Sequence, residues 1–420
     1  MVISPKVIHI AASDSDGGAS RAAYRLHRAL QKLTGNSEML VGRKKCDDEL
    51  VHEIRRPRLL SFINRIKRLL SEKKWADFSA PGQFFHTSAN YSNDILSGIR
   101  QLPHDIVNIH WIGSETLSIE EIEIIEKPIV LTLHDMWAFC GAEHHSPDVP
   151  AARFRVGYVH GNRTKGETGA DLNRWVWERK RKAWKKGMAI VCPSRWLADC
   201  ANGSLLFRGW QIHCIPNPLD VERWRPLPNK YSRQLLGLPA EERILLFAAN
   251  GGELNPFKGA DMLFEALTLL QQRGACNVHL VVLGRSTPKM PVGYPCPVTY
   301  LGKLQDDTSL VAAYNAADVV IVPSSQENLP QAAIEAHACG IPVVAFNIGG
   351  LPDIIEHQKT GYLARPFDIT DLADGIAWVL GDEQLRQMLG SAARKSAVCK
   401  YAEPVIAKVY GELYEQLQNS

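Results

Sequence analysis

The sequence predicts an α/β protein with two domains, each built on a parallel sheet with helices on both faces. Short apolar strand patterns alternate with amphipathic helical patterns along the chain, which is typical of such sheets. A length of 420 residues is enough for two or three domains that each bury their own core. A proline-rich turn cluster, residues 215–220, separates two series of strands and marks the predicted boundary.

Each series is a run of short apolar segments. The first series predicts strands at residues 6–10, 105–110, 129–133 and 188–192. The second predicts strands at residues 243–247, 278–283, 298–301, 319–322 and 342–345. We therefore predict a first domain over residues 1–215 and a second over residues 216–402. Sequence alone would pack the last helical pattern, residues 403–420, on the second domain.

Composition excludes several classes of protein. The chain is 45% hydrophobic and 22% charged, as in ordinary globular proteins, and no apolar run approaches the ~18 residues that span a bilayer. Its nine cysteines are scattered without a C-x-x-C pair, and no secretory signal is apparent, so we expect a reducing, cytoplasmic compartment. The net charge of +3 is too small to predict a nucleic-acid partner.

The most informative stretch of the chain is residues 325–336, which follows a predicted buried strand. Glu327 lies in the loop that closes this strand, and Glu335 lies eight positions later, in a helix that Pro330 opens at a first-turn position. Ligands of open α/β sheets bind outside the carboxyl ends of the strands, so we expect Glu335 to look back toward a crevice that Glu327 borders. Alternatively, Glu327 caps the helix and Glu335 is solvated.

The stretch resembles the Glu-x7-Glu signature of retaining GT-B glycosyltransferases of family 4. The surroundings match too: Pro-Ser before the first Glu, Asn-Leu-Pro after it, then Glu-Ala and Gly-Ile-Pro-Val-Val-Ala. This resemblance implies a GT-B fold, two doubly wound Rossmann-like domains facing a central cleft, with helix 403–420 returning to the first domain. It also implies that Glu327 binds the donor sugar and Glu335 the ribose hydroxyls, and that Asn328 and Leu329 help to bind the donor.

A glycine loop follows the first predicted strand and opens a helix. Gly17 and Gly18 would let backbone N–H groups approach a ligand where the helix N-terminus favours negative charge. A tight turn without a ligand explains the pair equally well, and the absence of G-x-G-x-x-G weakens a nicotinamide interpretation. In the resembling family this loop lies near the donor phosphates and the acceptor.

His134 follows a strong apolar strand, in residues 132–137, Thr-Leu-His-Asp-Met-Trp. A histidine at a strand end can be a neutral donor or a proton carrier near pH 7. The segment resembles that of capsule, colanic-acid and exopolysaccharide glycosyltransferases, which implies that His134 reaches the donor sugar and its phosphate. The alternative is a histidine at the edge of a sheet whose hydrogen bonds are satisfied within the protein.

Lys258 lies at the start of a helix after the first strand of the second domain. Its charge would add to the helix dipole and loop amides at a diphosphate. Family members usually carry an Arg before this Lys-Gly, and here it is missing, so Asn250 or Asn255 could take its place. The alternative is an ordinary surface lysine.

We expect no metal and no cofactor. Cys140, Glu143, His144 and His145 are crowded but lack paired zinc-ligand spacing. Asp14-Ser15-Asp16 resembles the Asp-x-Asp of GT-A transferases only superficially, because that motif belongs after a later strand.

Two basic segments raise the question of other partners. Residues 55–74 contain eight basic residues and one acid, with apolar residues at helical spacing, which suits an anionic membrane surface; a packed helix with a solvated basic face is the alternative. Residues 174–186 mix tryptophan with basic residues, as in RNA-stacking surfaces, although an ordinary sheet-covering helix is favoured there.

Together with these observations, the resemblance implies a retaining hexosyltransferase of polysaccharide biosynthesis. It would move a sugar from a nucleotide-diphosphate donor to a glycan or lipid-linked acceptor at the inner face of the cytoplasmic membrane. We expect no nucleic-acid partner. Glu327, His134 and Lys258 would act in catalysis. The rival classes are a GT-B sugar-nucleotide epimerase or a phosphorylase, and a non-enzymatic membrane-surface or RNA-binding protein.

Overall fold

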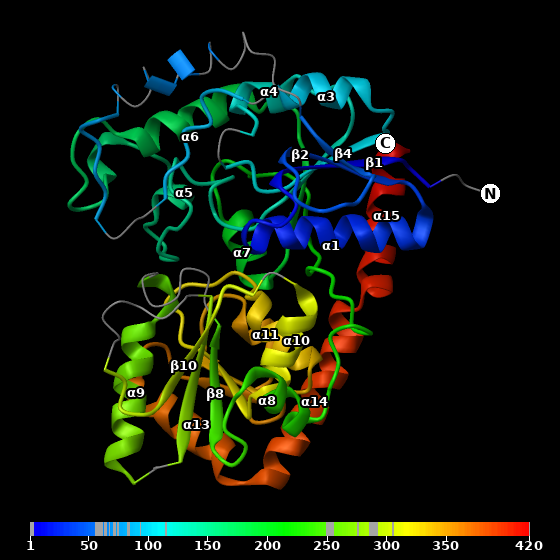
Figure 1. The fold of residues 1–420 in the computed structure, drawn as a ribbon. Helices are drawn as coiled ribbons and strands as arrows, with labels where there is room; N and C mark the ends of the chain where they lie inside the picture. The colour runs from blue at the N-terminus through cyan, green and yellow to red at the C-terminus, as the bar shows by residue number, and fades with distance from the viewer. Residues whose placement is uncertain are drawn as a thin grey trace. The chain divides into compact units, whose positions relative to one another are not determined.

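The computed structural model describes residues 4–54, 62, 65–66, 68–69, 73, 75–81, 85–92, 94–113, 116–248, 256–274, 277–284, 293–304 and 306–419. The chain forms two compact units, which Figure 1 shows coloured along the sequence. Unit 1 comprises Met1–Asn217 with Ile406–Ser420, and unit 2 comprises Pro218–Val405. The predicted boundary after residue 215 lies two residues before the observed one.

Unit 1 is built on a seven-stranded parallel sheet of order β3-β2-β1-β4-β5-β6-β7. Every residue of β4 and β6 is buried, because helices cover both faces of the sheet. The predicted strands correspond to β1, β4, β5 and β6. The strands are β1 Val7–Ser13, β2 Ser37–Arg43, β3 Val51–Glu53, β4 Ile106–Ile109, β5 Ile129–Thr132, β6 Ala189–Cys192 and β7 Ile212–Cys214.

Helices cover both faces of this sheet, and Figure 1 shows α1 and α3 on opposite sides of its strands. The helices are α1 Gly17–Thr34, α3 Ile95–Gln101, α4 Ile119–Glu123, α5 Arg153–Val156, α6 Leu172–Ala183, α7 Arg195–Asn202 and α15 Glu403–Gln418, with a 3-10 turn η1 at His160–Asn162. From Ile406 onward α15 belongs to unit 1, where Tyr414 accepts a hydrogen bond from Asn108 on β4 at 2.7 Å.

The basic segment at residues 174–186 forms most of α6, and its tryptophans pack inward. Trp177 and Trp184 are buried, and the Trp184 indole donates to the Ile119 carbonyl at 2.9 Å. Because base stacking needs an exposed ring face, these two tryptophans are not available to RNA. The segment is thus an ordinary helix that packs against α4 and adds its buried residues to the apolar core of unit 1.

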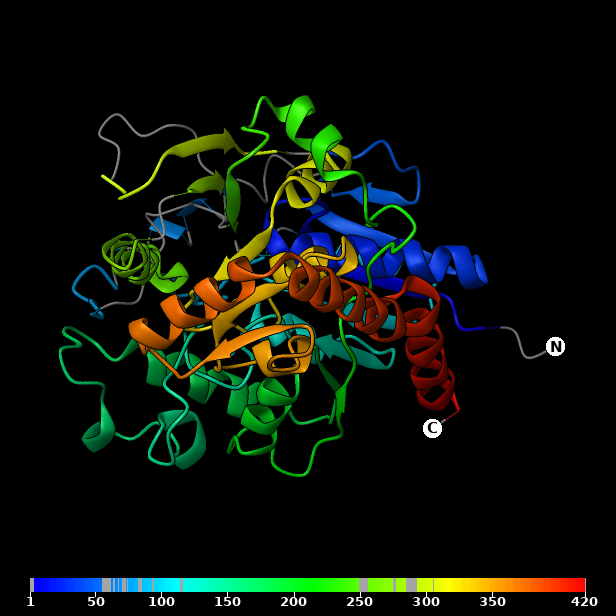
Figure 2. The ribbon, with the colours of Figure 1, turned by 90° about the horizontal axis from the view of Figure 1, so that it is seen from below.

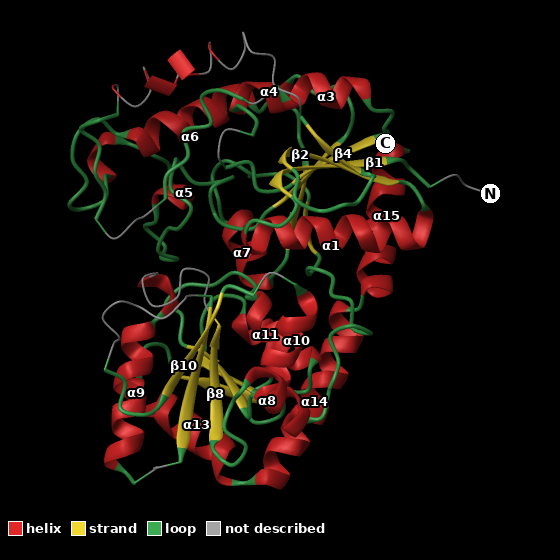
Figure 3. Cartoon of the chain, viewed as in Figure 1, coloured by secondary structure: helices red, strands yellow, loops and turns green. Residues whose placement is uncertain are grey.

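Unit 2 is built on a six-stranded parallel sheet of order β10-β9-β8-β11-β12-β13. Its strands, yellow in Figure 3, are β8 Arg243–Ala248, β9 Val278–Leu283, β10 Val298–Gly302, β11 Val319–Val322, β12 Val343–Phe346 and β13 Gly361–Ala364. Its helices are α8 Asn229–Leu236, α9 Ala260–Gln272, α10 Asp307–Ala316, α11 Gln331–Ala338, α12 Leu351–Ile354, α13 Ile369–Gly381 and α14 Glu383–Tyr401, with a 3-10 turn η3 at Pro256–Lys258.

Alternate residues of the unit 2 strands supply two separate apolar cores. Ile244 and Leu246 pack with α10 and α11, whereas Leu245 and Phe247 pack with α9 and α13. The helices therefore lie on both faces of the sheet, as the second view shows (Figure 2). The predicted α/β architecture of two doubly wound parallel sheets is confirmed.

Candidate active site

In unit 2 a lysine and a glutamate from two neighbouring loops form an ion pair. Lys258 ends η3, directly before α9, and Glu327 lies in the loop after β11. The Lys258 ammonium donates to Glu327 Oε1, which also accepts from the Ser324 hydroxyl at 3.0 Å. Glu327 therefore does not cap α11, and Lys258 is not an isolated surface lysine.

Backbone contacts hold these two loops together. The Ser325 N–H donates to the Phe257 carbonyl at 2.9 Å. Gly259 has a φ of +68°, and a Cβ built there would overlap the Pro323 carbonyl. Gly349 has a φ of +52°, and a Cβ built there would overlap the Glu327 carbonyl. Glycine is needed at both positions because side chains are excluded by the close approach and by the left-handed backbone.

Glu335 is buried within α11, with 4% of its surface exposed. Its Oε2 accepts a hydrogen bond from the Tyr314 hydroxyl of α10 at 2.9 Å. The alternative of a solvated Glu335 is therefore wrong. Pro330 is the N-cap of α11, one position before the first-turn position that the sequence suggested, because the helix begins at Gln331.

The other predicted donor-binding residues of this loop have different environments. Asn328 is half-buried in the loop between β11 and α11. Leu329 is buried in an apolar cluster of unit 2, so any donor contact would come from its backbone. Asn250 and Asn255 lie outside the described residues, as does the place of the missing family arginine.

In unit 1, three histidines from three neighbouring strands form a hydrogen-bonded chain. His9 lies on β1, His110 directly follows β4, and His134 follows β5. His9 Nδ1 lies 3.1 Å from His110 Nε2, and His110 Nδ1 lies 3.1 Å from His134 Nε2. Burial lowers the pKa of His134 to about 4, and it holds the pKa of His9 and His110 well below the usual range. All three imidazoles are therefore neutral at pH 7.

A second polar chain lies next to His134. Asp135 Oδ2 accepts from His144 Nδ1 at 2.7 Å and from the Trp111 indole at 2.9 Å, and His144 Nε2 lies 2.7 Å from the Thr87 hydroxyl. Burial alone would raise the pKa of Asp135, but the charge and hydrogen bond of His144 lower it to about 2. Asp135 is thus a permanent carboxylate that fixes the segment after His134.

The predicted glycine loop starts α1 and borders a polar pocket. Gly17 and Gly18 are the first residues of α1, and Asp16 is its N-cap residue. A cavity of about 510 Å³ here is lined by Ser13, Asp16, Arg43, Glu53 and Trp111, among others. Arg43 pairs with Asp16 at 2.9 Å, so the one arginine of the lining already has a carboxylate partner.

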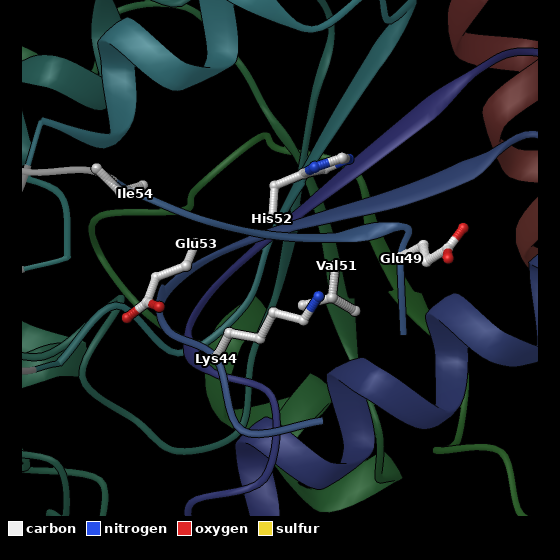
Figure 4. Close-up of a pocket in the computed structure, with 6 residues that line it drawn as sticks. All are labelled: Lys44, Glu49, Val51, His52, Glu53 and Ile54. Atoms are coloured by element: carbon white, nitrogen blue, oxygen red, sulfur yellow. The ribbon is translucent and has the colours of Figure 1, made fainter. Parts of the chain in front are cut away.

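A neighbouring cavity of about 470 Å³ lies along β3 (Figure 4). Its two cationic or imidazole groups are already paired, because His52 contacts Glu38 at 2.9 Å and the Lys44 ammonium donates to the Asp48 carbonyl at 2.6 Å. We therefore place the candidate site at the pocket beside Gly17 rather than here.

Several of these residues were not predicted from the sequence. Ser324 and Tyr314 orient the two glutamates, while His9 contacts His110 and His110 contacts His134. A signal existed for His110, since it ends an apolar strand pattern, whereas His9 lies inside one. Tyr314 is 21 residues from Glu335, and no local pattern connects them.

The described part of the chain offers neither a cluster of metal ligands nor a membrane-spanning helix. There, no three His, Cys, Asp or Glu side chains are grouped so that they could hold a metal ion. Among the same residues, no helix is both long enough and apolar enough to cross a bilayer.

Solved structures show which class of fold the two units form. A sucrose-phosphate synthase from Thermosynechococcus elongatus superposes with a TM-score of 0.65 at 19% identity, covering 98% of both chains. Anabaena HepE, crystallised with UDP and glucose, gives 0.65 at 17% identity and covers 98% of this chain and 99% of its own. Together with the parallel sheets, these similarities define the GT-B class of fold.

Sequence comparisons give the family. The model of Glycosyltransferase Family 4 matches residues 16–223, and that of Glycosyl transferases group 1 matches residues 230–396. A D-inositol 3-phosphate glycosyltransferase of Xylanimonas cellulosilytica is 33% identical over 321 residues, which are 70% of this chain and 68% of that protein. The chain belongs to the group 1 glycosyltransferases of family 4.

Other relatives match over a shorter range. A D-inositol 3-phosphate glycosyltransferase of Saccharomonospora viridis is 36% identical over 200 residues, which are 44% of this chain and 46% of that protein. The matched part spans about half the length of most such curated relatives.

Proposed function

We propose that this chain transfers a sugar from a nucleotide-diphosphate donor to a hydroxyl of a glycan or lipid-linked acceptor, with retention of configuration, in polysaccharide biosynthesis. The observation that carries this proposal is the Lys258–Glu327 ion pair at the start of α9, eight residues before the buried Glu335. It gives one loop cluster a cation for a diphosphate and a carboxylate for sugar hydroxyls. Because a related fold was crystallised with UDP and glucose, UDP-sugars are the first donors to test.

The proposed chemistry depends on stabilising the leaving group. The bond between the anomeric carbon and the diphosphate breaks, and a bond to the acceptor oxygen forms on the same face of the sugar. The acceptor proton passes to the departing phosphate, and no separate base is required. In unit 2, Lys258 and helix-end amides would stabilise the charge that grows on the diphosphate, and Glu327 would hold the sugar. In unit 1, the family resemblance gives His134 the role of a hydrogen-bond donor to the sugar or its phosphate.

The pocket beside Gly17 is the proposed acceptor site. Trp111 offers a ring for stacking, and Asp16 and Glu53 offer oxygens that accept hydrogen bonds from hydroxyls. These groups suit a sugar or polyol. The relatives named after D-inositol 3-phosphate make that compound a necessary acceptor to include in any test.

The direct test incubates the chain with UDP- and GDP-sugars and with three acceptor classes: oligosaccharides, lipid-linked sugars and D-inositol 3-phosphate. We expect a glycoside whose anomeric configuration, read from proton coupling in its NMR spectrum, equals that of the donor. An inverted product would overturn retention. Conversion of the donor to its epimer without any acceptor would instead establish the epimerase.

Replacing Glu335 by alanine is expected to weaken binding of the free nucleoside diphosphate about 10- to 100-fold. A hydrogen bond to a buried carboxylate contributes about 1.5 to 3 kcal/mol, and Glu335 is proposed to accept such bonds from the ribose. Isothermal titration calorimetry measures the change. The matched control is Tyr314→Phe, which removes only the hydroxyl that donates to Glu335 and should cost less affinity. Equal affinities of the wild type and Glu335→Ala would exclude the ribose role.

Turnover is expected to survive removal of divalent cations. Lys258 and the amides at the start of α9 would supply the positive charge that a metal supplies in other transferases. Initial rates would be measured with EDTA and then with added magnesium or manganese. If EDTA abolished the reaction and either metal restored it, this assignment would fail.

We also propose that residues 55–74 bind the anionic inner surface of the cytoplasmic membrane. Most of this segment lies outside the described residues, but Phe62, Ile66 and Leu69 are described and exposed, at helical spacing. For these three residues a buried apolar stripe is therefore excluded, whereas an apolar face resting on a bilayer agrees with their exposure.

Changing Arg65 and Arg68 to glutamate should reduce sedimentation with anionic vesicles at low salt. Each basic residue near such a surface contributes about 1 kcal/mol, so losing two should weaken binding more than tenfold. The control is Arg225→Glu with Lys230→Glu, a charge reversal of two exposed residues in unit 2. Equal sedimentation of both double variants, or no preference for anionic over neutral vesicles, would reject membrane binding through this segment.

A further inference from the structure

The chain of three histidines in unit 1 allows only two arrangements of protons. Each neutral imidazole carries one N–H, and each of the two hydrogen bonds needs one proton between its nitrogens. His110 can donate from Nδ1 to His134, which then carries its proton on Nδ1 while His9 Nε2 is bare. In the other arrangement every bond is reversed, so that His9 Nε2 carries a proton and His134 Nδ1 is bare.

The buried end of the chain discriminates between these arrangements. His9 is 0% exposed, and its Nε2 has no hydrogen-bond partner among the residues that the structure describes. A buried N–H without an acceptor is rarer than an acceptor without a donor, so the arrangement with a bare His9 Nε2 is favoured. The His134 end is only half-buried, so a proton there is not forced into an apolar environment.

We propose that His9 and His110 are positioning residues that hold His134 as the tautomer with its proton on Nδ1. The ring stacking supports a fixed orientation as well, because the rings of His110 and His134 lie 5.4 Å apart at an interplanar angle of 29°. His134 is thereby a neutral hydrogen-bond donor that needs no reorientation when a sugar phosphate arrives. The value of this donor in turnover rests on the proposed function, but the tautomer does not.

Nuclear magnetic resonance of the full chain labelled with 15N-histidine tests the tautomer without any substrate. Protonated and bare nitrogens of a neutral imidazole have well separated 15N shifts, and His134→Gln identifies the His134 signals by their loss. We expect Nδ1–H at His134 in the wild type. A proton on His134 Nε2 would overturn the proposal.

Two substitutions of His110 separate positioning from packing. His110→Phe removes both hydrogen bonds, whereas His110→Asn keeps an amide donor near the place of Nδ1. We expect His110→Phe to change the His134 shifts and to lower kcat about 100-fold, with KM for the donor nearly unchanged. We expect His110→Asn to recover most of the wild-type shifts and most of the wild-type kcat. If kcat fell equally in both variants, in step with the melting temperature and with unchanged His134 shifts, His110 would be a packing residue only.

The proposed function and the tautomer of His134 are tested by separate parts of the experiment. A wild type that transfers no sugar would refute the proposed function, while its His134 shifts would still decide the tautomer. If His110→Phe does not fold, His110→Asn carries the test, since it must retain the wild-type His134 shifts.

Discussion

Glu327→Gln is expected to lower kcat by about 100- to 1,000-fold while leaving the affinity for the free nucleoside diphosphate equal or higher. The substitution keeps the size of the side chain but removes its charge and its ion pair with Lys258. Losing one preorganised electrostatic contact at a reacting centre typically costs this much in turnover. The diphosphate should not bind more weakly, because Lys258 no longer has Glu327 as a competing partner. Steady-state kinetics and calorimetry measure the two effects.

Two further variants show whether the loss belongs to the carboxylate. Ser324→Ala removes only the 3.0 Å hydrogen bond to Glu327 Oε1, so it should cost much less in kcat. Lys258→Met should have the opposite effect on binding from Glu327→Gln: the affinity for the nucleoside diphosphate should fall. Wild-type turnover in Glu327→Gln would show that this carboxylate does not act on the sugar.

The candidate site of unit 2 was more predictable from sequence than that of unit 1. Glu327 and Glu335 belong to one strand-loop-helix unit, so their spacing in the sequence predicts that one lies in the loop and the other in the helix. The Lys258–Glu327 contact spans 69 positions, and only the parallel order of β8 and β11 brings the two loops together. The histidine chain spans 101 positions between His9 and His110, and no local pattern predicts which strands are neighbours.

The strands that sequence analysis missed are mostly edge strands. β3 and β7 have three residues each, and both lie at the edges of the unit 1 sheet. A strand at an edge needs no continuous apolar run, since one side of it has no neighbouring strand. β2 is internal and was also missed, because its apolar run is only Met39–Val41, bounded by Glu38 and Gly42.

Lys180 is a single residue whose environment could not be predicted from the sequence. In the sequence it is one of several basic residues of α6, and lysines are almost always exposed. In the structure it is fully buried, and its ammonium donates to the carbonyls of Trp137, Cys140 and Gly141. Burial lowers its pKa to about 7, although Cys140 and Glu143 oppose this effect.

Lys180→Met is expected to lower the free energy of unfolding of unit 1 by about 3 to 5 kcal/mol. The methionine retains most of the apolar stem, but three buried carbonyls lose their donor, and the contact of the ammonium with the Trp137 ring at 3.5 Å is lost. Because these carbonyls belong to the segment that follows His134 and Asp135, turnover should fall too. Urea unfolding followed by tryptophan fluorescence measures the stability.

Lys182→Met is the matched control, since Lys182 lies on the same helix and is exposed. It makes the same chemical change without removing a buried donor, so its stability should stay within about 0.5 kcal/mol of the wild type. If the two variants unfolded at the same urea concentration, the ammonium of Lys180 would not be what holds this segment. A large loss in Lys180→Met alone would show that a buried cation organises the backbone on which His134 and Asp135 depend.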